Sequence, residues 1–227
     1  MPIGVLTNIG AVLVGTAVGA VAGTRFPERI RETVLGALGL LTAAVAVREI
    51  MPTNEFPLVL GAVLLGAVIG ELLRIEGGLS AVGMMLQRRF AGDASDSRFS
   101  EGFIVASLVF CVGPLTIIGS IEDGLGDPEL LFVKSGLDGF ASIAFAAVYG
   151  WGVGLAAVTV AVIQGGLALT AGLFDGVLTD PMLDALGAAG GVLLLGISLR
   201  LLDLKQIRVA NMLPAIVLAP LFVWWWG

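Results

Sequence analysis

Eight apolar segments of about twenty residues each dominate the chain, and each is long enough to cross a hydrocarbon core of about 30 Å as a helix. They cover residues 3–22, 34–51, 56–73, 102–121, 132–149, 151–173, 185–202 and 210–226. The 227-residue chain is 57% hydrophobic and only 13% charged, which excludes an ordinary soluble globule and a nucleic-acid-binding protein. We therefore predict an all-α polytopic membrane protein with about eight transmembrane helices, surrounded by the lipid bilayer and forming a single transmembrane domain over residues 1–227.

Basic residues indicate how these segments are oriented. Most of the 12 lysine and arginine residues fall between segments 1 and 2, 3 and 4, or 7 and 8. With eight crossings these three loops share one side, which the positive-inside rule makes cytoplasmic. We expect a plasma (inner) membrane protein with both termini external. Residues 74–101 form the longest cytoplasmic loop, with an amphipathic helix near Leu79–Leu86 and a linker at 92–97. Acidic residues such as Glu122 and Asp123 fall in the external loops.

Two stretches of the chain resemble each other and predict an internal repeat. Leu35-Gly-Ala-Leu-Gly opens segment 2 and Leu186-Gly-Ala-Ala-Gly opens segment 7, while an Asn-x-x-Pro pattern precedes segments 3 and 8. The repeat units would be residues 1–73 and 151–227, on either side of central helices in 102–149. They are offset by five helices, so one copy is inverted across the membrane. Inverted repeats are common in secondary transporters, although a duplicated scaffold would show the same pattern.

Segment 4 contains a predicted break at Gly113–Pro114. Pro114 has no N–H to donate, so the carbonyl of Phe110 loses its helical partner and needs another one in a membrane. Thr116 and Ser120 lie four residues apart on one face of the helix that follows. Free carbonyls around Gly113 and these hydroxyls could serve as neutral ligands. The alternative is a proline kink whose hydroxyls bond back to the chain.

Segment 5 carries the most unusual residues for a membrane helix. Ser135, Asp138 and Ser142 form one stripe, with Lys134 four residues before the carboxylate. An ionisable residue at this depth is costly and should face the interior of the bundle. We interpret Asp138 as an ion or proton acceptor, with a monovalent cation site at Asp138, Thr116 and Ser120. The alternative is a closed Lys134–Asp138 pair that only holds helices together.

Weaker candidates are Asn8, Gln164 and Asn211, which either line the site or hydrogen-bond helices together. Glu71 and Arg74 are expected to pair at the membrane interface. Glycines spaced four apart, at Gly15–Gly23 and Gly66–Gly70, predict close helix packing within the bundle or between the subunits of a homodimer.

Missing residue types narrow the chemistry. The chain has no histidine and a single cysteine, Cys111, which excludes a Ser-His-Asp triad, histidine-ligated metals and a thiolate cluster within one chain. It also lacks a glycine-rich phosphate loop. We therefore expect neither an enzyme nor a bound cofactor.

Several of these motifs together resemble the DUF554 family of bacterial and archaeal inner-membrane proteins. They are Gly119-Ser-Ile-Glu-Asp-Gly-Leu, Lys134-Ser-Gly-Leu-Asp-Gly-Phe-Ala-Ser-Ile, Gln164-Gly and Ala210-Asn-Met-Leu-Pro-Ala-Ile. The resemblance covers nearly the whole chain and implies a helical membrane protein, sometimes labelled a transport protein. It does not imply a substrate.

The broken segment, the intramembrane carboxylate and the repeat together favour a secondary transporter of a small solute or ion, linked to a cation or a proton. Two rival hypotheses stay open. A passive ion channel would use the same residues along a continuous wet pore. A non-transporting membrane scaffold or accessory subunit would keep Lys134 and Asp138 in a closed pair.

Overall fold

Helices account for nearly all of the structure, as the apolar segments predict. The computed structural model describes residues 2–90, 97–173 and 176–226, and none of these residues lies in a strand. The linker predicted at 92–97 lies outside the described residues except for its last residue. The α-helices are α1 (Ile3–Gly23), α2 (Glu28–Ile50), α3 (Phe56–Leu73), α4 (Ile75–Phe90), α5 (Ser97–Cys111), α6 (Pro114–Leu125), α7 (Glu129–Tyr149), α8 (Ala156–Leu169), α9 (Asp180–Leu201) and α10 (Pro214–Trp226). Short 3₁₀ turns are η1 (Gly150–Leu155), η2 (Ala171–Leu173) and η3 (Val209–Met212).

The outer faces of these helices are apolar, as expected where the surrounding solvent is lipid. Leu13, Val14 and Val18 of α1 are each half exposed or more, as are Leu64 and Leu72 of α3. The faces that pack inward combine glycine and alanine with larger apolar residues such as Phe110 and Leu193, and they also carry a few polar residues. Because lipid offers no hydrophobic drive for helices to associate, small residues and hydrogen bonds are what hold such a bundle together.

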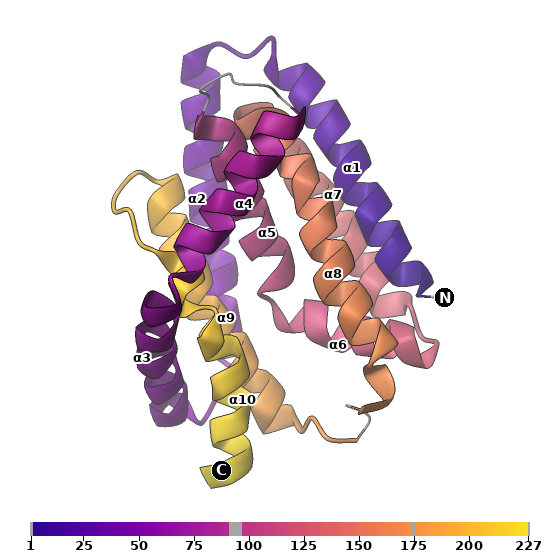
Figure 1. Ribbon diagram of the computed structural model, residues 1–227, viewed down its shortest axis with the longest axis vertical. Helices are drawn as coiled ribbons and strands as arrows, with labels where there is room; N and C mark the ends of the chain where they lie inside the picture. The colour runs from indigo at the N-terminus through magenta and orange to yellow at the C-terminus, as the bar shows by residue number, and fades with distance from the viewer. Residues whose placement is uncertain (1, 91–96, 174–175, 227) are drawn as a thin grey trace. The chain divides into compact units, whose positions relative to one another are not determined.

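By length and composition, six stretches of the described chain are long and apolar enough to cross a membrane, and the bent pair α5–α6 would make a seventh. This count treats residues 129–169 as one stretch of 41 residues. Within that stretch the chain reverses beside α1 (Figure 1): Gly15 lies against Ser142 of α7, whereas Thr16 lies against Gly154, just before α8. The eight-crossing arrangement and the inverted repeat stay predictions.

The described chain groups into two compact units. Unit 1 comprises residues 1–35, 80–111 and 115–175, and unit 2 comprises residues 36–79, 112–114 and 176–227. In unit 1, α1 packs along α7 and also contacts α8, while α5 packs against α7, η1 and α8 (Figure 1).

Glycines bring α1 and α7 together closely in unit 1. A Cβ atom built on Gly15, Gly19 or Gly23 would overlap the α7 backbone at Gly139, Ile143 or Ala147, respectively. The two backbones therefore touch along two turns, which is possible only because these three positions lack a side chain. This confirms that the glycine pattern of α1 is a packing surface within the bundle.

Unit 2 is built around α3, α9 and α10. Its core is rich in alanine, and Ala62, Ala188, Ala189 and Ala215 are fully buried there beside larger residues such as Met182. Gly66 and Gly70 of α3 lie against the backbone at Ala215 and Asn211, so the second glycine pattern also packs within the bundle. Helix α2 joins this unit through the Ser198 hydroxyl of α9, which donates to the carbonyl of Gly39 over 2.8 Å.

The two Asn-x-x-Pro patterns both mark helix starts. Pro57 is the second residue of α3 and Pro214 is the first residue of α10. Proline is favoured in the first turn of a helix, where its missing N–H has no partner to lose. The match between the two patterns therefore has a local cause, besides any duplication.

The predicted break of segment 4 is present. Helix α5 ends at Cys111, Gly113 lies in the bend, and α6 begins at Pro114, with an angle of 65° between the two helices. The amphipathic helix predicted near Leu79–Leu86 is also present, as part of the longer helix α4.

Candidate functional site

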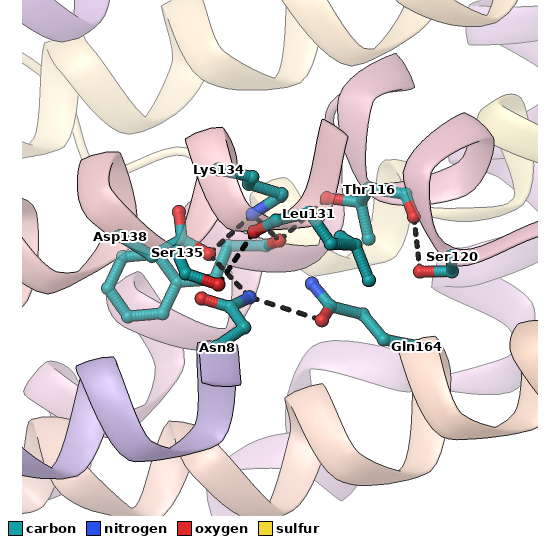
Figure 2. Close-up of polar contacts among 9 residues, drawn as sticks. Asn8, Thr116, Ser120, Leu131, Lys134, Ser135, Asp138 and Gln164 are labelled. Carbon is teal, nitrogen blue, oxygen red and sulfur yellow. Dashed lines mark hydrogen bonds and ion pairs between the residues drawn. The ribbon is translucent and has the colours of Figure 1, made fainter. Parts of the chain in front are cut away.

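Four polar side chains from three helices meet in the interior of unit 1. Asn8 comes from α1, Lys134 and Asp138 from α7, and Gln164 from α8 (Figure 2). All four are buried, with exposures between 0% and 7%. Hence the structure brings together four residues that are 26 to 156 positions apart in sequence, apart from the neighbouring pair on α7.

Lys134 is the centre of this cluster. Its Nζ donates to the carboxylate of Asp138 in a closed ion pair and to the carbonyl oxygen of Phe110 over 2.9 Å. That carbonyl is the one left without a helical partner by the break before Pro114. Lys134 thus supplies the hydrogen-bond donor that the Phe110 carbonyl loses at the break. Its positive charge also lies at the C-terminal end of α5, where the helix dipole favours a cation.

Asn8 and Gln164 extend the cluster from the carboxylate to α8. The Nδ2 of Asn8 donates to Asp138 Oδ2 over 2.9 Å and to Gln164 Oε1 over 3.1 Å. A carboxylate only accepts, so Asn8 must present its NH₂ group to Asp138. Gln164 must then present its oxygen to that same NH₂ group, and this order fixes the orientation of both amides.

Four buried atoms on neutral polar side chains of unit 1 have no partner in the described protein, and two of them belong to Asn8 and Gln164 of the cluster itself. They are Asn8 Oδ1, Gln164 Nε2, Ser142 Oγ and Thr16 Oγ1. Buried polar groups are nearly always hydrogen-bonded, so a group of four in one helical unit is unusual. The sequence analysis missed Thr16, although it lies eight residues after Asn8, near the same face of α1.

The other predicted hydroxyl ligands are bonded to their own chain. Thr116 donates to the Phe110 carbonyl over 2.8 Å, Ser120 to the Thr116 carbonyl, and Ser135 to the Leu131 carbonyl (Figure 2). This is the arrangement expected from the alternative interpretation, a proline kink with hydroxyls bonded back to the backbone. Thr116 still contributes to the cluster, because it shares the Phe110 carbonyl with Lys134.

Asp123 differs from its expected place in an external loop. It lies in α6 and is only 6% exposed, because its carboxylate oxygens accept from the backbone N–H groups of Gly4 (3.0 Å) and Val5 (2.9 Å). The first N–H groups of a helix have no intrahelical partner, so a carboxylate there satisfies them and complements the helix dipole. Asp123 thus joins the end of the broken segment to the start of α1.

Asn211 belongs to unit 2 and to a different polar cluster. Its Nδ2 donates to Glu71 over 2.6 Å, and its Oδ1 accepts from the backbone N–H of Glu76 over 2.7 Å. Glu76 in turn accepts from Arg200 over 2.9 Å. The expected Glu71–Arg74 pair is corrected: Glu71 pairs with Arg208, because the chain turns at Arg74, whose φ is 54°.

The oxygen atoms of unit 1 limit which ions it could hold. Among the described residues, no three histidine, cysteine, aspartate or glutamate side chains are placed to hold one metal ion. The cluster offers one carboxylate and neutral oxygens instead. A single negative charge with carbonyl and hydroxyl oxygens balances a monovalent cation better than a divalent one.

Comparison with known proteins places the chain among uncharacterised membrane proteins. A family model described as "Protein of unknown function (DUF554)" matches residues 3–224. The chain is 34% identical to the uncharacterized protein YqgA of Escherichia coli (strain K12), over 99% of this chain and 98% of the relative. It is 24% identical to the uncharacterized membrane protein YdfK of Bacillus subtilis (strain 168), over 97% and 95% of the two chains. No solved structure matches.

Proposed function

This chain belongs to the DUF554 family of proteins of unknown function, and from that premise we propose that it is a secondary transporter of a small solute or ion, linked to a proton or a cation. Its binding site is the cluster of Asn8, Lys134, Asp138 and Gln164 in unit 1. No catalytic step is proposed.

The observation that carries this proposal is the burial of an ionised pair beside unpartnered polar atoms. Removing Lys134 and Asp138 from water costs several kcal/mol per ion, and a well-packed apolar pair of similar volume would often be as stable or more stable. Packing alone therefore gives little reason for these charges. In addition, Asn8 Oδ1, Gln164 Nε2 and Ser142 Oγ have no partner in the described protein, which suits a small polar ligand.

The orientation in the membrane is part of the same proposal. We propose eight crossings in a plasma membrane, with α7 and α8 as separate crossings because both run beside α1 in opposite directions. Both termini are external in this arrangement, and residues 1–73 and 151–227 are the two copies of an inverted repeat. We also propose that two copies of the chain can form a homodimer through their exposed apolar helix faces.

A scaffold or accessory subunit is the second candidate, and one observation favours it. Lys134 and Asp138 form a closed pair, as a purely structural role requires. The two candidates differ in whether the pair ever opens. A transporter has a ligand that binds at Asp138, whereas a scaffold has none. A passive channel would need the same residues in contact with a continuous water path.

Thermal unfolding of the purified protein in detergent separates these candidates. We would titrate Na⁺, K⁺, Li⁺, pH and a panel of small anionic and amino-acid solutes, because a ligand at 100 times its Kd stabilises the folded state by about 2.7 kcal/mol. The transporter hypothesis predicts stabilisation by at least one of them, lost in Asp138→Asn and kept in Asp127→Asn, a control in the exposed loop before α7. If no solute stabilises the protein and Asp138→Asn unfolds well below wild type, as the loss of a structural pair requires, the scaffold hypothesis replaces it.

A further inference from the structure

The two charges of the buried cluster already have partners. Lys134 Nζ donates to Asp138 and to the Phe110 carbonyl oxygen, and Asp138 Oδ2 also accepts from Asn8 Nδ2. The pair carries no net charge, so an ion added beside it would leave one uncompensated charge in a low-dielectric interior, which is costly. Helices α1 and α8, which supply Asn8 and Gln164, hold no charged residue to balance such an ion. The substrate of this cluster is therefore expected to be uncharged, whichever ion drives its transport.

The two amides of the cluster leave one acceptor and one donor group open. Asn8 Nδ2 donates to Asp138 and to Gln164 Oε1 (Figure 2). The atoms without a partner in the described protein are Asn8 Oδ1, which accepts, and Gln164 Nε2, which carries two N–H donors. Both side chains are 0% exposed, so solvent does not satisfy these atoms. A molecule that complements them needs a donor for the Asn8 oxygen and an acceptor for the Gln164 nitrogen.

We propose that Asn8 and Gln164 bind a small uncharged molecule that carries both a hydrogen-bond donor and an acceptor, as a primary amide or an alcohol does. The inference rests on the proposed function and names the substrate class of the same site. An N–H or O–H of the solute donates to Asn8 Oδ1, and its carbonyl or hydroxyl oxygen accepts from Gln164 Nε2. Lys134 and Asp138 stay paired, and Asp138 acts as a positioning residue that holds the Asn8 amide with its oxygen toward the solute.

Two hydroxyls further along α1 and α7 have the same unmet need. Thr16 Oγ1 and Ser142 Oγ are buried and have no partner in the described protein. A helical hydroxyl ordinarily bonds back to a carbonyl of the preceding turn, as Thr7 does to Ile3 over 2.8 Å. Thr16 and Ser142 make no such bond, although either hydroxyl can both donate and accept.

These hydroxyls lie at one level of the bundle, because Gly15, the neighbour of Thr16, lies against Ser142. Thr16 follows Asn8 by eight residues, which is about 12 Å along a helix. A solute of a few heavy atoms cannot contact Asn8 and Thr16 at once. Thr16 and Ser142 therefore form a second position for the same class of solute, on a path through unit 1 that begins at Asn8 and Gln164.

Solutes of one shape and different charge test the first position. Thermal unfolding of the full chain in detergent, with Na⁺ and K⁺ present throughout, compares acetamide with acetate, acetamidinium and acetone. Acetate and acetamidinium carry a charge, and acetone has an acceptor but no donor. Acetamide should stabilise the protein with a saturating shift. The other three should bind at least about tenfold more weakly, because each leaves a charge or a buried polar atom unpaired. Ethylene glycol, run in parallel, shows whether an alcohol serves as well as an amide.

Variants then test the named side chains. Gln164→Met removes the open donor and should bind acetamide about threefold to tenfold more weakly than wild type. Thr16→Val and Ser142→Ala remove hydroxyls that bond to nothing in the described protein, so both should unfold no lower than wild type. Each should nevertheless slow acetamide uptake into proteoliposomes, measured above protein-free vesicles. The matched control is Thr7→Val, an exposed position on the same helix, which should leave uptake unchanged.

Each outcome decides the matter. Acetone binding as tightly as acetamide would overturn the inference, since the Asn8 oxygen would then not be read. If only an ion or a charged solute stabilises the protein in an Asp138-dependent way, the uncharged substrate is wrong but the transporter hypothesis stands. If nothing binds and no uptake exceeds that of protein-free vesicles, both fail. Unchanged uptake in Thr16→Val and Ser142→Ala would overturn the second position. Should Gln164→Met not fold, the solute series in wild type still decides.

Discussion

The buried pair on α7 allows a sharp prediction, in which a second substitution rescues the first. Lys134→Met removes the ammonium but keeps most of the side-chain volume, and it leaves Asp138 as a buried carboxylate with the Asn8 amide as its described donor. Breaking a buried pair by removing one partner typically costs about 3–5 kcal/mol. Adding Asp138→Asn to Lys134→Met removes the stranded charge, so the double variant should unfold within about 2 kcal/mol of wild type.

The size of this effect follows from the exposure of the two side chains. Lys134 and Asp138 are 5% and 7% exposed, so solvent screens the remaining charge very little. For a chain of this length, roughly 2–4 °C of Tm corresponds to 1 kcal/mol. Lys134→Met should therefore unfold roughly 6–20 °C below wild type, and the double variant should recover most of that loss.

The assay is thermal unfolding in detergent with choline as the only monovalent cation, so that cation binding at Asp138 does not mask the loss. Asp127→Asn serves as the control for changing an aspartate that is exposed. The reasoning is refuted if Lys134→Met is as stable as wild type, or if Asp138→Asn lowers the stability of Lys134→Met further. Either result would mean that the two groups do not stabilise each other in the folded protein.

Four further predictions test the packing, capping, polar cluster and orientation. Gly19→Ala should lower the free energy of unfolding by about 1–3 kcal/mol because its Cβ would overlap the Ile143 carbonyl. Its control is Gly10→Ala on the same helix, which meets nothing within 4 Å and should be neutral or slightly stabilising when the two are compared by thermal unfolding. Asp123→Ala should cost about 0.5–2 kcal/mol through the loss of two N–H partners on α1, and its neighbour Glu122→Ala should cost less in the same assay. Glu76→Gln should lower the free energy of unfolding by about 1–3 kcal/mol, because Glu76 accepts from Arg200 and from the Ala210 N–H. In the same thermal unfolding assay Glu28→Gln, which weakens only the pair with Arg31, should change it by under about 0.5 kcal/mol. The orientation can be tested with an impermeant maleimide in a Cys111→Ser background, which lacks the native thiol. The reagent should label Asp127→Cys only from outside the cell and Lys205→Cys only from the cytoplasm. Labelling of both positions from the same side would contradict the proposed crossings.

Composition and local pattern were enough to predict the class of the protein and several of its local features. Long apolar segments have one stable arrangement in lipid, the helix, because every backbone N–H and C=O must be satisfied within the segment. Pro114 likewise predicts a break wherever it stands in a helix, since it has no N–H to donate. Glycines spaced four apart predict a close helix contact for an equally local reason, and Gly15 and Gly19 make one.

Tertiary structure decided which residues meet, because the meeting depends on distant parts of the chain. Sequence reasoning named Asn8, Gln164 and Asn211 as equals, yet the first two join Asp138 while Asn211 bonds to Glu71 in unit 2. It placed Asp123 in a solvated loop, although the start of α1, more than a hundred residues away, buries it. Sequence alone identified the Phe110 carbonyl as unsatisfied, but only the packing of α7 against α5 shows that Lys134 satisfies it. A local pattern can show that a polar group needs a partner, whereas the choice of partner depends on how the helices pack.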